Sequence, residues 1–288
     1  MAQGVEWVEP STSHVEPPRS PEDVAEELRQ LRDQVRRLSE QVNALAARPR
    51  QEDGRIPTHI QGFDAGIEGG LPRGHVVLLT GPTGAMKTSL ALYVVARNRA
   101  LGSRAVYVTV EELRGSILQT MRRLGLGDQE DFIVDISRLR LERAGTEEVR
   151  DWIQVLRDYL ERRRDREPLG IVVIDSLNAI TALAQVRDAR ADLFHFLNFL
   201  RSLGVTTILV EERDPDGPRV EHDVDFLADG ILELRFSGAG HGRVQLLLRC
   251  AKMRHTKHSR DYYDLTHGEG RFVARPYESP RRRWGRRG

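Results

Sequence analysis

The segment LLTGPTGAMKTS, residues 78–89, most constrains what this chain can fold into. A short apolar run of strand type, His75 to Thr80, leads into a glycine-rich turn, and Lys87 and Thr88 open a segment with helical periodicity. The backbone N–H groups of such a turn and the N-terminus of the following helix bind phosphate oxygens. The lysine adds a positive charge, and the threonine hydroxyl ligates Mg²⁺. The segment therefore predicts a P-loop that binds a nucleotide triphosphate.

One position departs from the P-loop pattern, because Met86 stands where a second glycine is expected. A side chain there can hinder the approach of the backbone to phosphate, so slow hydrolysis, or tight binding without turnover, stays open. If the side chain obstructs the phosphates, Met86→Gly should raise turnover. A chance turn before a helix is the alternative to a P-loop. The residues expected to bind the nucleotide are Gly81, Pro82, Thr83, Gly84, Ala85, Met86, Lys87, Thr88 and Ser89.

The composition is that of a soluble chain with a substantial core, because 39% of its 288 residues are hydrophobic and 30% are charged. No apolar run approaches the roughly 18 residues that span a membrane, and the N-terminus lacks a basic-then-apolar signal pattern. The single cysteine, Cys250, excludes a disulfide framework and suits a reducing compartment. We therefore expect a cytoplasmic protein without a membrane partner.

The two ends of the chain differ from its middle. Residues 1–19 are rich in Pro, Ser and Glu without a period and are expected to be disordered. Residues 20–48 carry apolar side chains at alternating spacings of four and three. This pattern predicts a coiled-coil helix that pairs subunits or recruits a protein partner, with an amphipathic helix lying on its own domain as the alternative. Residues 49–55 read as a linker, and residues 278–288 as a basic tail containing five arginines.

Between these ends, apolar runs of strand type alternate with helical segments. The expected strands are residues 75–80, 105–110, 131–136, 171–174 and 205–210, and the expected helices after the P-loop helix are residues 113–124, 146–164 and 191–203. Uninterrupted apolar strands between helices predict an α/β fold with a mostly parallel sheet covered on both faces. From Gly230 the helices stop, so Ile231–Phe236 and Val244–Cys250 are expected as antiparallel strands at the sheet edge.

Five further motifs follow one another in a characteristic order. They are GFDAGIEGGLPRG at residues 62–74, Glu111-Glu112 after VYVTV, VVIDS at residues 172–176, Ala228-Asp229-Gly230, and KMRHTKHSR at residues 252–260. With the P-loop, they resemble the KaiC-like branch of the RecA-like ATPases over residues 56–277. The resemblance implies a single ATPase domain that uses ATP and Mg²⁺. It also implies a homo-oligomeric ring, expected to be hexameric, with nucleotide at the subunit boundaries.

The chemistry of ATP hydrolysis assigns expected roles to several side chains. Asp175 ends an apolar strand, where a carboxylate would hold Mg²⁺ together with Thr88; a helix N-cap is the alternative. Glu111 is expected to position or deprotonate the attacking water, with Glu112 supporting or replacing it. An acid pair in the first turn of a helix is the alternative for these two glutamates. Lys87 completes the predicted catalytic set.

Four basic side chains near the C-terminus complete the expected nucleotide site. Lys252 and Arg254 are two apart on a predicted strand, so they project to the same face. The resemblance implies that they reach the nucleotide of the neighbouring subunit, and that His258 and Arg260 make further contacts there. A solvated basic edge strand is the alternative. The other histidines show no metal-ligand spacing, so no zinc site is expected.

These observations favour a nucleotide-dependent regulator or signalling protein that hydrolyses ATP. A RecA-like mediator of DNA recombination or repair and a nucleotide-binding scaffold with little hydrolysis are the alternatives. Residues 211–225 contain seven acids and two arginines, a net charge of −5 that repels a DNA backbone. Nucleic acid would therefore bind only through the basic tail. Asp225-Phe226 stand where the clock protein of this family carries a Ser-Thr autophosphorylation pair, so autokinase activity is not expected.

Overall fold

The computed structural model describes residues 54–136, 152–183, 189–213, 224–239 and 243–278, together with residues 30 and 32–33. The chain divides into two units, Met1–Arg50 and Gln51–Gly288. In the first unit the described residues are helical and exposed. The rest of the predicted coiled coil, the N-terminal segment expected to be disordered, most of the predicted linker and nearly all of the basic tail lie outside the described residues.

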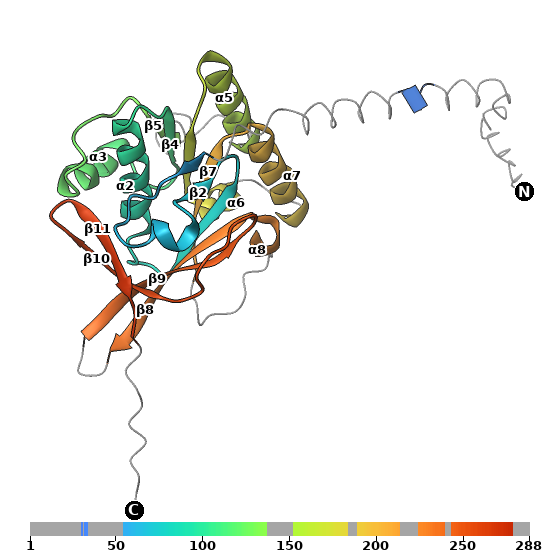
Figure 1. Ribbon diagram of the computed structural model, residues 1–288. Helices are drawn as coiled ribbons and strands as arrows, with labels where there is room; N and C mark the ends of the chain where they lie inside the picture. Colours follow the sequence, from blue (N-terminus) through green and yellow to red (C-terminus); the bar gives the residue numbers. More distant parts are fainter. Residues whose placement is uncertain are drawn as a thin grey trace, which may run out of the picture. The chain divides into compact units, whose positions relative to one another are not determined.

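A nine-stranded sheet organises the second unit, in the order β11-β10-β9-β8-β3-β7-β6-β4-β5 (Figure 1). Its strands are β3 (Val76–Gly81), β4 (Ala105–Thr109), β5 (Ile133–Asp135), β6 (Ile171–Asp175), β7 (Thr206–Glu212), β8 (Gly230–Ala239), β9 (Arg243–Met253), β10 (Tyr263–Gly268) and β11 (Arg271–Pro276). A separate pair consists of β1 (Arg55–Ile56) and β2 (Leu71–Pro72), with the 3-10 helix η1 (Asp64–Ile67) between them.

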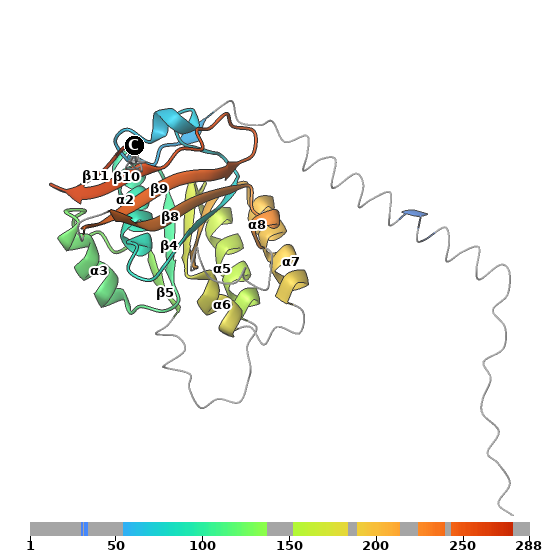
Figure 2. The same cartoon turned by 90° about the horizontal axis from the view of Figure 1, so that it is seen from below.

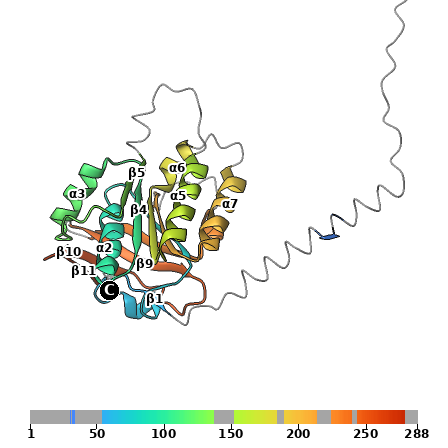
Figure 3. The same ribbon diagram turned by 90° about the horizontal axis from the view of Figure 1, so that it is seen from above.

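The helices cover both faces of this sheet. They are α2 (Lys87–Ala100), α3 (Arg114–Arg123), α5 (Trp152–Arg166), α6 (Leu177–Leu183), α7 (Ala189–Ser202) and the short α8 (Val224–Leu227). Figure 2 and Figure 3 show α2 and α3 on one side and α5, α6 and α7 on the other. None of the described helices is long and apolar enough to span a membrane.

The strand β3 shows why the central strands lack an alternating pattern. All six of its residues are buried. Val77 and Leu79 pack with α2 and α3, whereas Val76 and Leu78 pack with α5, α6 and α7. Because both faces are covered, apolar side chains occupy four consecutive positions, Val76 to Leu79, in place of an alternating pattern. The predicted α/β fold with a mostly parallel sheet is confirmed.

One strand direction differs from the prediction. The segment Ile231–Phe236, expected to be antiparallel, lies in β8 and pairs parallel with β3, with Leu78 opposite Ile231. The reason is the connection: after β7 ends, the chain returns through α8 to the edge where the parallel strands begin. The two predicted segments do pair antiparallel with each other, as β8 and β9, and in the described nine-stranded sheet β9–β10 and β10–β11 are antiparallel too.

The sequence analysis also missed the hairpin of β10 and β11. Glu269 and Gly270 form its turn with φ values of 50° and 70°, the left-handed geometry that favours glycine in tight hairpins. Phe272 and Ala274 are buried on β11, so this strand has the alternating pattern of a half-covered sheet. The glycine-rich turn and the alternation were both readable in the sequence.

Candidate functional site

The P-loop turn lies between the end of β3 and the start of α2. Gly81 belongs there because a Cβ atom would stand 2.8 Å from the carbonyl oxygen of Leu234 on β8. Gly84 has a φ of +79° and open space around it. Thr83 and Gly84 are exposed, whereas Ala85 is buried. The turn therefore presents its tip to solvent at the carboxyl edge of the parallel strands.

Met86 adopts the backbone conformation that the missing glycine would favour. Its φ of 60° and ψ of 26° place it in the left-handed region immediately before α2. This conformation costs a non-glycine residue about 1 kcal/mol. The side chain is partly buried and packs against the core beneath α2 and α3. It therefore points into the protein rather than over the exposed tip of the turn.

Lys87 reaches back across the turn from the first residue of α2. Its Nζ donates to the carbonyl oxygens of Gly81, at 2.9 Å, and Pro82, at 2.8 Å. Burial lowers the pKa of this ammonium, although the nearby carboxylates of Glu212 and Asp175 act in the opposite direction. The charge is thus already held at the loop that is predicted to receive phosphate.

The two predicted magnesium ligands meet. Thr88 Oγ1 donates to Asp175 Oδ2 at 2.7 Å, and the hydroxyl of Tyr107 donates to the same oxygen at 2.6 Å. Burial raises the pKa of Asp175, against the effect of these two hydrogen bonds. Burial and the adjacent carboxylate also hold the pKa of Tyr107 well above its ordinary value. A hydroxyl and a carboxylate at one point form the hard oxygen donor set that suits Mg²⁺.

The two adjacent glutamates after β4 point to different neighbours. Glu111 is exposed, and its Oε1 accepts a hydrogen bond from the hydroxyl of Ser176, the residue after Asp175. The Oε2 of Glu112 accepts from Ser116 Oγ in α3 at 2.6 Å, and its backbone N–H donates to Thr109 Oγ1 at 3.2 Å. Glu111 is therefore the glutamate that lies next to the predicted metal ligand.

A third carboxylate at this edge belongs to Glu212, the last residue of β7. Its Oε1 accepts a hydrogen bond from Thr83 in the P-loop. Asn178 of α6 fixes the backbone of Glu212: the N–H of Glu212 donates to Asn178 Oδ1 at 2.7 Å, and Asn178 Nδ2 donates to the Glu212 carbonyl at 3.2 Å. The sequence analysis had placed Glu212 in an acidic loop.

The prediction of an acidic loop at residues 211–225 is wrong for the residues that the structure describes. Glu211 and Glu212 lie in β7, and the side chain of Glu211 is only 3% exposed. Arg213 Nη2 lies 2.7 Å from the carboxylate of Glu211, and Arg213 Nη1 lies 2.8 Å from that of Asp225 in α8. Residues 214–223 lie outside the described part. The acids that bracket them are therefore partly neutralised rather than forming one solvated loop.

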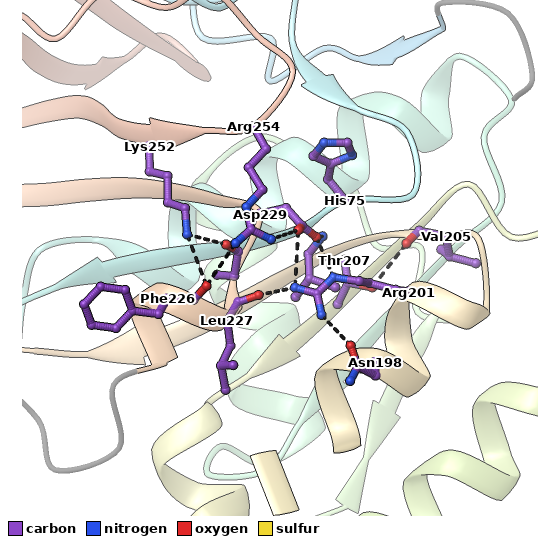
Figure 4. A network of polar contacts seen from close by, with 12 residues as sticks. His75, Asn198, Arg201, Val205, Thr207, Phe226, Leu227, Asp229, Lys252 and Arg254 are labelled. Carbon is purple, nitrogen blue, oxygen red and sulfur yellow. Dashed lines mark hydrogen bonds and ion pairs between the residues drawn. The ribbon is translucent and has the colours of Figure 1, made fainter. Parts of the chain in front are cut away.

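Lys252 and Arg254 converge near α8 (Figure 4), although Arg254 lies just beyond β9 and not on the strand where the sequence placed both residues. Lys252 Nζ donates to the carbonyl oxygens of Asp225 and Ala228, both at 2.7 Å. Arg254 Nη1 lies 3.0 Å from Asp229 Oδ1, and its Nη2 donates to the Phe226 carbonyl at 3.1 Å. We call Lys252 and Arg254 the basic pair.

Asp229 anchors this end of the structure. Arg201 of α7 lies 3.0 Å from Asp229 Oδ2, and the backbone N–H of Val76 donates to the same oxygen at 3.1 Å. Although burial alone would raise it, the pKa of Asp229 is lowered by Arg201 and the Val76 N–H. The basic pair is therefore fastened to the start of β3.

The basic pair lies near the start of β3, whereas the P-loop of the same chain follows the end of that strand. Lys252 pairs with Ile231, which is opposite Leu78, three residues before the end of β3 at Gly81. Arg254 follows the end of β9. Two further predicted residues lie in the loop before β10: His258, half-buried, with Nδ1 3.0 Å from the Ser259 carbonyl oxygen, and Arg260, exposed.

The predicted site residues thus form two groups. The first, around the P-loop, contains Lys87, Thr88, Asp175 and Glu111. The second contains the basic pair: the N–H of Arg254 donates to the Asp229 carbonyl, and the N–H of Asp229 donates to the carbonyl of Val76, the first residue of β3, whereas the first group lies beyond its last residue.

A comparison with protein families matches this chain to "ATPase: KaiC" over residues 56–272. The chain belongs to the KaiC family of ATPases.

Similar relatives include the circadian clock oscillator protein KaiC of Parasynechococcus marenigrum, which is 30% identical over 229 residues, and that of Thermostichus vulcanus, which is 31% identical over 230 residues. The alignments cover 74% and 75% of this chain but 43% of each relative, so the chain spans less than half their length. A crystal structure of a KaiC-like protein from the hyperthermophilic archaeon Pyrococcus horikoshii OT3 is also similar. It is 29% identical, with a TM-score of 0.65, covering 78% of this chain and 100% of that one. The fold is accordingly RecA-like.

Three residues of this KaiC-family site escaped the sequence analysis. They are Tyr107, Ser176 and Glu212, which contact Asp175, Glu111 and Thr83 respectively. A signal for Tyr107 was present, because it is a polar aromatic residue inside an otherwise aliphatic strand. Glu212 could not be found in this way, since its place depends on which strand lies next to β3.

Proposed function

We propose that this KaiC-family chain binds Mg-ATP at its P-loop and hydrolyses it, and that the nucleotide state sets the conformation of a homo-oligomer that regulates or signals. The observation that carries this proposal is the meeting of Thr88 and Asp175, at 2.7 Å, beside the P-loop lysine. A Lys-Thr pair and a carboxylate from another strand are the parts that phosphoryl transfer requires at one point.

The residues divide the chemistry among them. Lys87 would leave the carbonyls of the turn to contact the β- and γ-phosphates, while Thr88 and Asp175 would hold Mg²⁺, which neutralises developing charge. Glu111 would position the attacking water and accept its proton. Its hydrogen bond from Ser176 restrains the carboxylate next to Asp175. Its exposure leaves room for that water to approach.

The positive charge for the transition state would come from a second copy of the chain. Because the basic pair lies at the opposite edge of the sheet, it can approach only the nucleotide of another subunit. If the P-loop of one subunit faces the basic pair of the next, the subunits are in head-to-tail contact. Such contacts generate a ring when the rotation between subunits closes. The resemblance to the KaiC-like branch favours six subunits in that ring.

The first experiment separates nucleotide binding from hydrolysis. Lys87→Ala should abolish ATP binding, because the ammonium is the main protein charge on the phosphates. Glu111→Gln should keep nucleotide affinity but slow turnover by on the order of 10²-fold or more, as expected for the loss of a general base. Binding is measured with a fluorescent ATP analogue, and turnover by phosphate release.

Two control variants match these changes. Arg122→Ala removes an exposed cation from α3, where the side chain is 58% exposed, and should leave binding unchanged. Glu112→Gln alters the glutamate that contacts Ser116 and should slow turnover much less than Glu111→Gln. Unchanged affinity in Lys87→Ala would refute the P-loop assignment. Binding without measurable turnover in the wild-type chain would favour the scaffold alternative.

A further inference from the structure

The end of β7 is hydrogen-bonded to the P-loop through one side chain and through the backbone. Glu212 accepts a hydrogen bond from Thr83, at the exposed tip of the turn. The backbone N–H of Arg213 donates to the carbonyl oxygen of Gly81 at 2.9 Å. That same Gly81 carbonyl also accepts from Lys87. Phosphate bound in the loop would compete with the Gly81 carbonyl for Lys87. It would also contact the turn to which Glu212 is hydrogen-bonded, so nucleotide would act directly on this end of β7.

Arg213 connects this strand end to α8. Its guanidinium lies 2.7 Å from the carboxylate of Glu211 and 2.8 Å from that of Asp225. Glu211 is buried in β7, whereas the side chain of Asp225 is 43% exposed. One end of this bridge is therefore fixed in the sheet, and the other holds a helix of only four residues.

That short helix supplies part of the support of the basic pair, the rest coming from the Ala228 carbonyl, which accepts from Lys252, and from Asp229, which pairs with Arg254. Lys252 donates to the Asp225 carbonyl. Arg254 donates to the Phe226 carbonyl (Figure 4), so both cations contact the backbone of α8. Asp225 therefore has two different contacts, with its carboxylate on Arg213 and its carbonyl on Lys252. A displacement of α8 would move the acceptors of both cations together.

We propose that the Arg213–Asp225 ion pair is a positioning element that couples the nucleotide in one subunit to the basic pair of that same subunit. The basic pair in turn acts on the nucleotide of the next subunit. This inference rests on the proposed function, in which Lys252 and Arg254 serve the neighbouring site. Its consequence is that nucleotide bound in one subunit changes the turnover of the adjacent one, so hydrolysis depends cooperatively on ATP concentration.

Asp225→Asn is the informative variant. It removes the charge from α8 while leaving the buried Glu211–Arg213 pair intact, whereas Arg213→Ala would remove the cation beside the buried Glu211 carboxylate and threaten folding. We expect ATP affinity to stay at the wild-type value, kcat to fall about five-fold, which corresponds to about 1 kcal/mol in the activation barrier, and cooperativity to disappear. Asp225→Glu, which keeps the charge, should restore kcat and cooperativity in large part.

The matched control is Asp131→Asn. Asp131 also pairs with an arginine, Arg99, at 2.7 Å, but it lies just before β5 at the far edge of the sheet. This variant should keep wild-type kcat and cooperativity. Thermal unfolding of Asp225→Asn and Asp131→Asn should show similar midpoints, so that a difference in turnover cannot come from unfolding.

A mixing experiment tests the action on the neighbour. Subunits with Glu111→Gln are expected to bind ATP but to hydrolyse it on the order of 10²-fold more slowly, so when they are mixed with wild-type subunits nearly all turnover comes from the wild-type sites. Adding Asp225→Asn to the Glu111→Gln subunits should lower that turnover, while adding Asp131→Asn should not. A purely structural role inside the mutated subunit would leave the wild-type sites unaffected.

Two results separate failure of this inference from failure of the proposed function. If Lys252→Ala and Arg254→Ala abolish turnover while Asp225→Asn behaves like Asp131→Asn, the coupling through Arg213 is wrong and the shared site stands. If Lys252→Ala and Arg254→Ala also leave turnover unchanged, the shared site itself is wrong.

Discussion

At the scale of single residues, Asp175 is a carboxyl group whose burial is unfavourable for its ionised form. Its carboxylate is almost fully buried at the end of β6, with hydrogen bonds only partly offsetting the loss of water, and its pKa is raised. Burial thus makes ionisation of this carboxyl less favourable than in water. Mg²⁺ would supply the positive charge that this position lacks.

This reasoning predicts the effect of Asp175→Asn on the free energy of unfolding without nucleotide. Because the folded-state pKa is raised, the wild type is relatively stable below the ordinary aspartate pKa and loses stability as pH rises through the folded-state value. The asparagine does not titrate and its amide oxygen can accept the same two hydrogen bonds. The variant should therefore be more stable than the wild type near neutral pH, and this advantage should shrink in acid.

Urea unfolding at a series of pH values measures this difference. Adding Mg-ATP should reverse the order near neutral pH, because only the wild type gains stability from the bound metal. A variant that is less stable than the wild type at every pH would show that the buried charge is not unfavourable.

The sequence predicted part of this residue-scale arrangement. Thr88 and Asp175 could be predicted as partners because a motif places each at the carboxyl edge of a parallel strand. Ser176 and Glu212 could not be given their roles, since their contacts join side chains from strands that only the sheet order brings together. The packing of Met86 was equally inaccessible, because a spacing pattern does not reveal which way a side chain turns.

At the scale of elements, the P-loop turn is shaped by Met86 rather than by a second glycine. The side chain packs against the core under α2, and the left-handed φ of 60° costs conformational free energy. The sequence alone favoured a rise in turnover for Met86→Gly. The observed packing favours the opposite expectation, because the side chain does not cover the exposed tip of the turn.

Comparing Met86→Gly with Met86→Ala separates packing from backbone conformation. Both variants lose the packed side chain, so neither should exceed wild-type turnover. Met86→Ala keeps a Cβ in the left-handed region and should be less stable than Met86→Gly by up to about 1 kcal/mol. Turnover and urea unfolding of both variants provide the measurement, and a rise in turnover for both would mean that the methionine side chain obstructs the phosphates.

Element types were predicted more successfully than element directions. The buried strands from β3 to β7 can be recognised in the sequence as continuous apolar runs, because helices cover both faces of the sheet. The direction of β8 depends on a connection through residues 213–229, which carries no pattern that reports where it returns to the sheet. The β10–β11 hairpin was missed although its turn residues and alternation were visible.

At the scale of the whole molecule, the sheet separates the two groups of predicted site residues. The P-loop, Asp175 and Glu111 lie where the parallel strands end, and the basic pair lies where they begin. In the proposed function, a single chain would therefore carry one nucleotide site and, where the parallel strands begin, the cations for the site of another subunit. The central claim of this account is that hydrolysis requires both edges, supplied by two copies.

Complementation between two inactive variants tests that claim most directly. Lys87→Ala subunits have an intact basic pair but no functional pocket, whereas Lys252→Ala/Arg254→Ala subunits have an intact pocket but no basic pair. Each variant alone should show little ATP turnover, and mixing the two should restore a substantial part of the wild-type rate, because some pockets then face an intact basic pair. A mixture as inactive as its components, or full turnover by the Lys252→Ala/Arg254→Ala protein alone, would contradict the shared site.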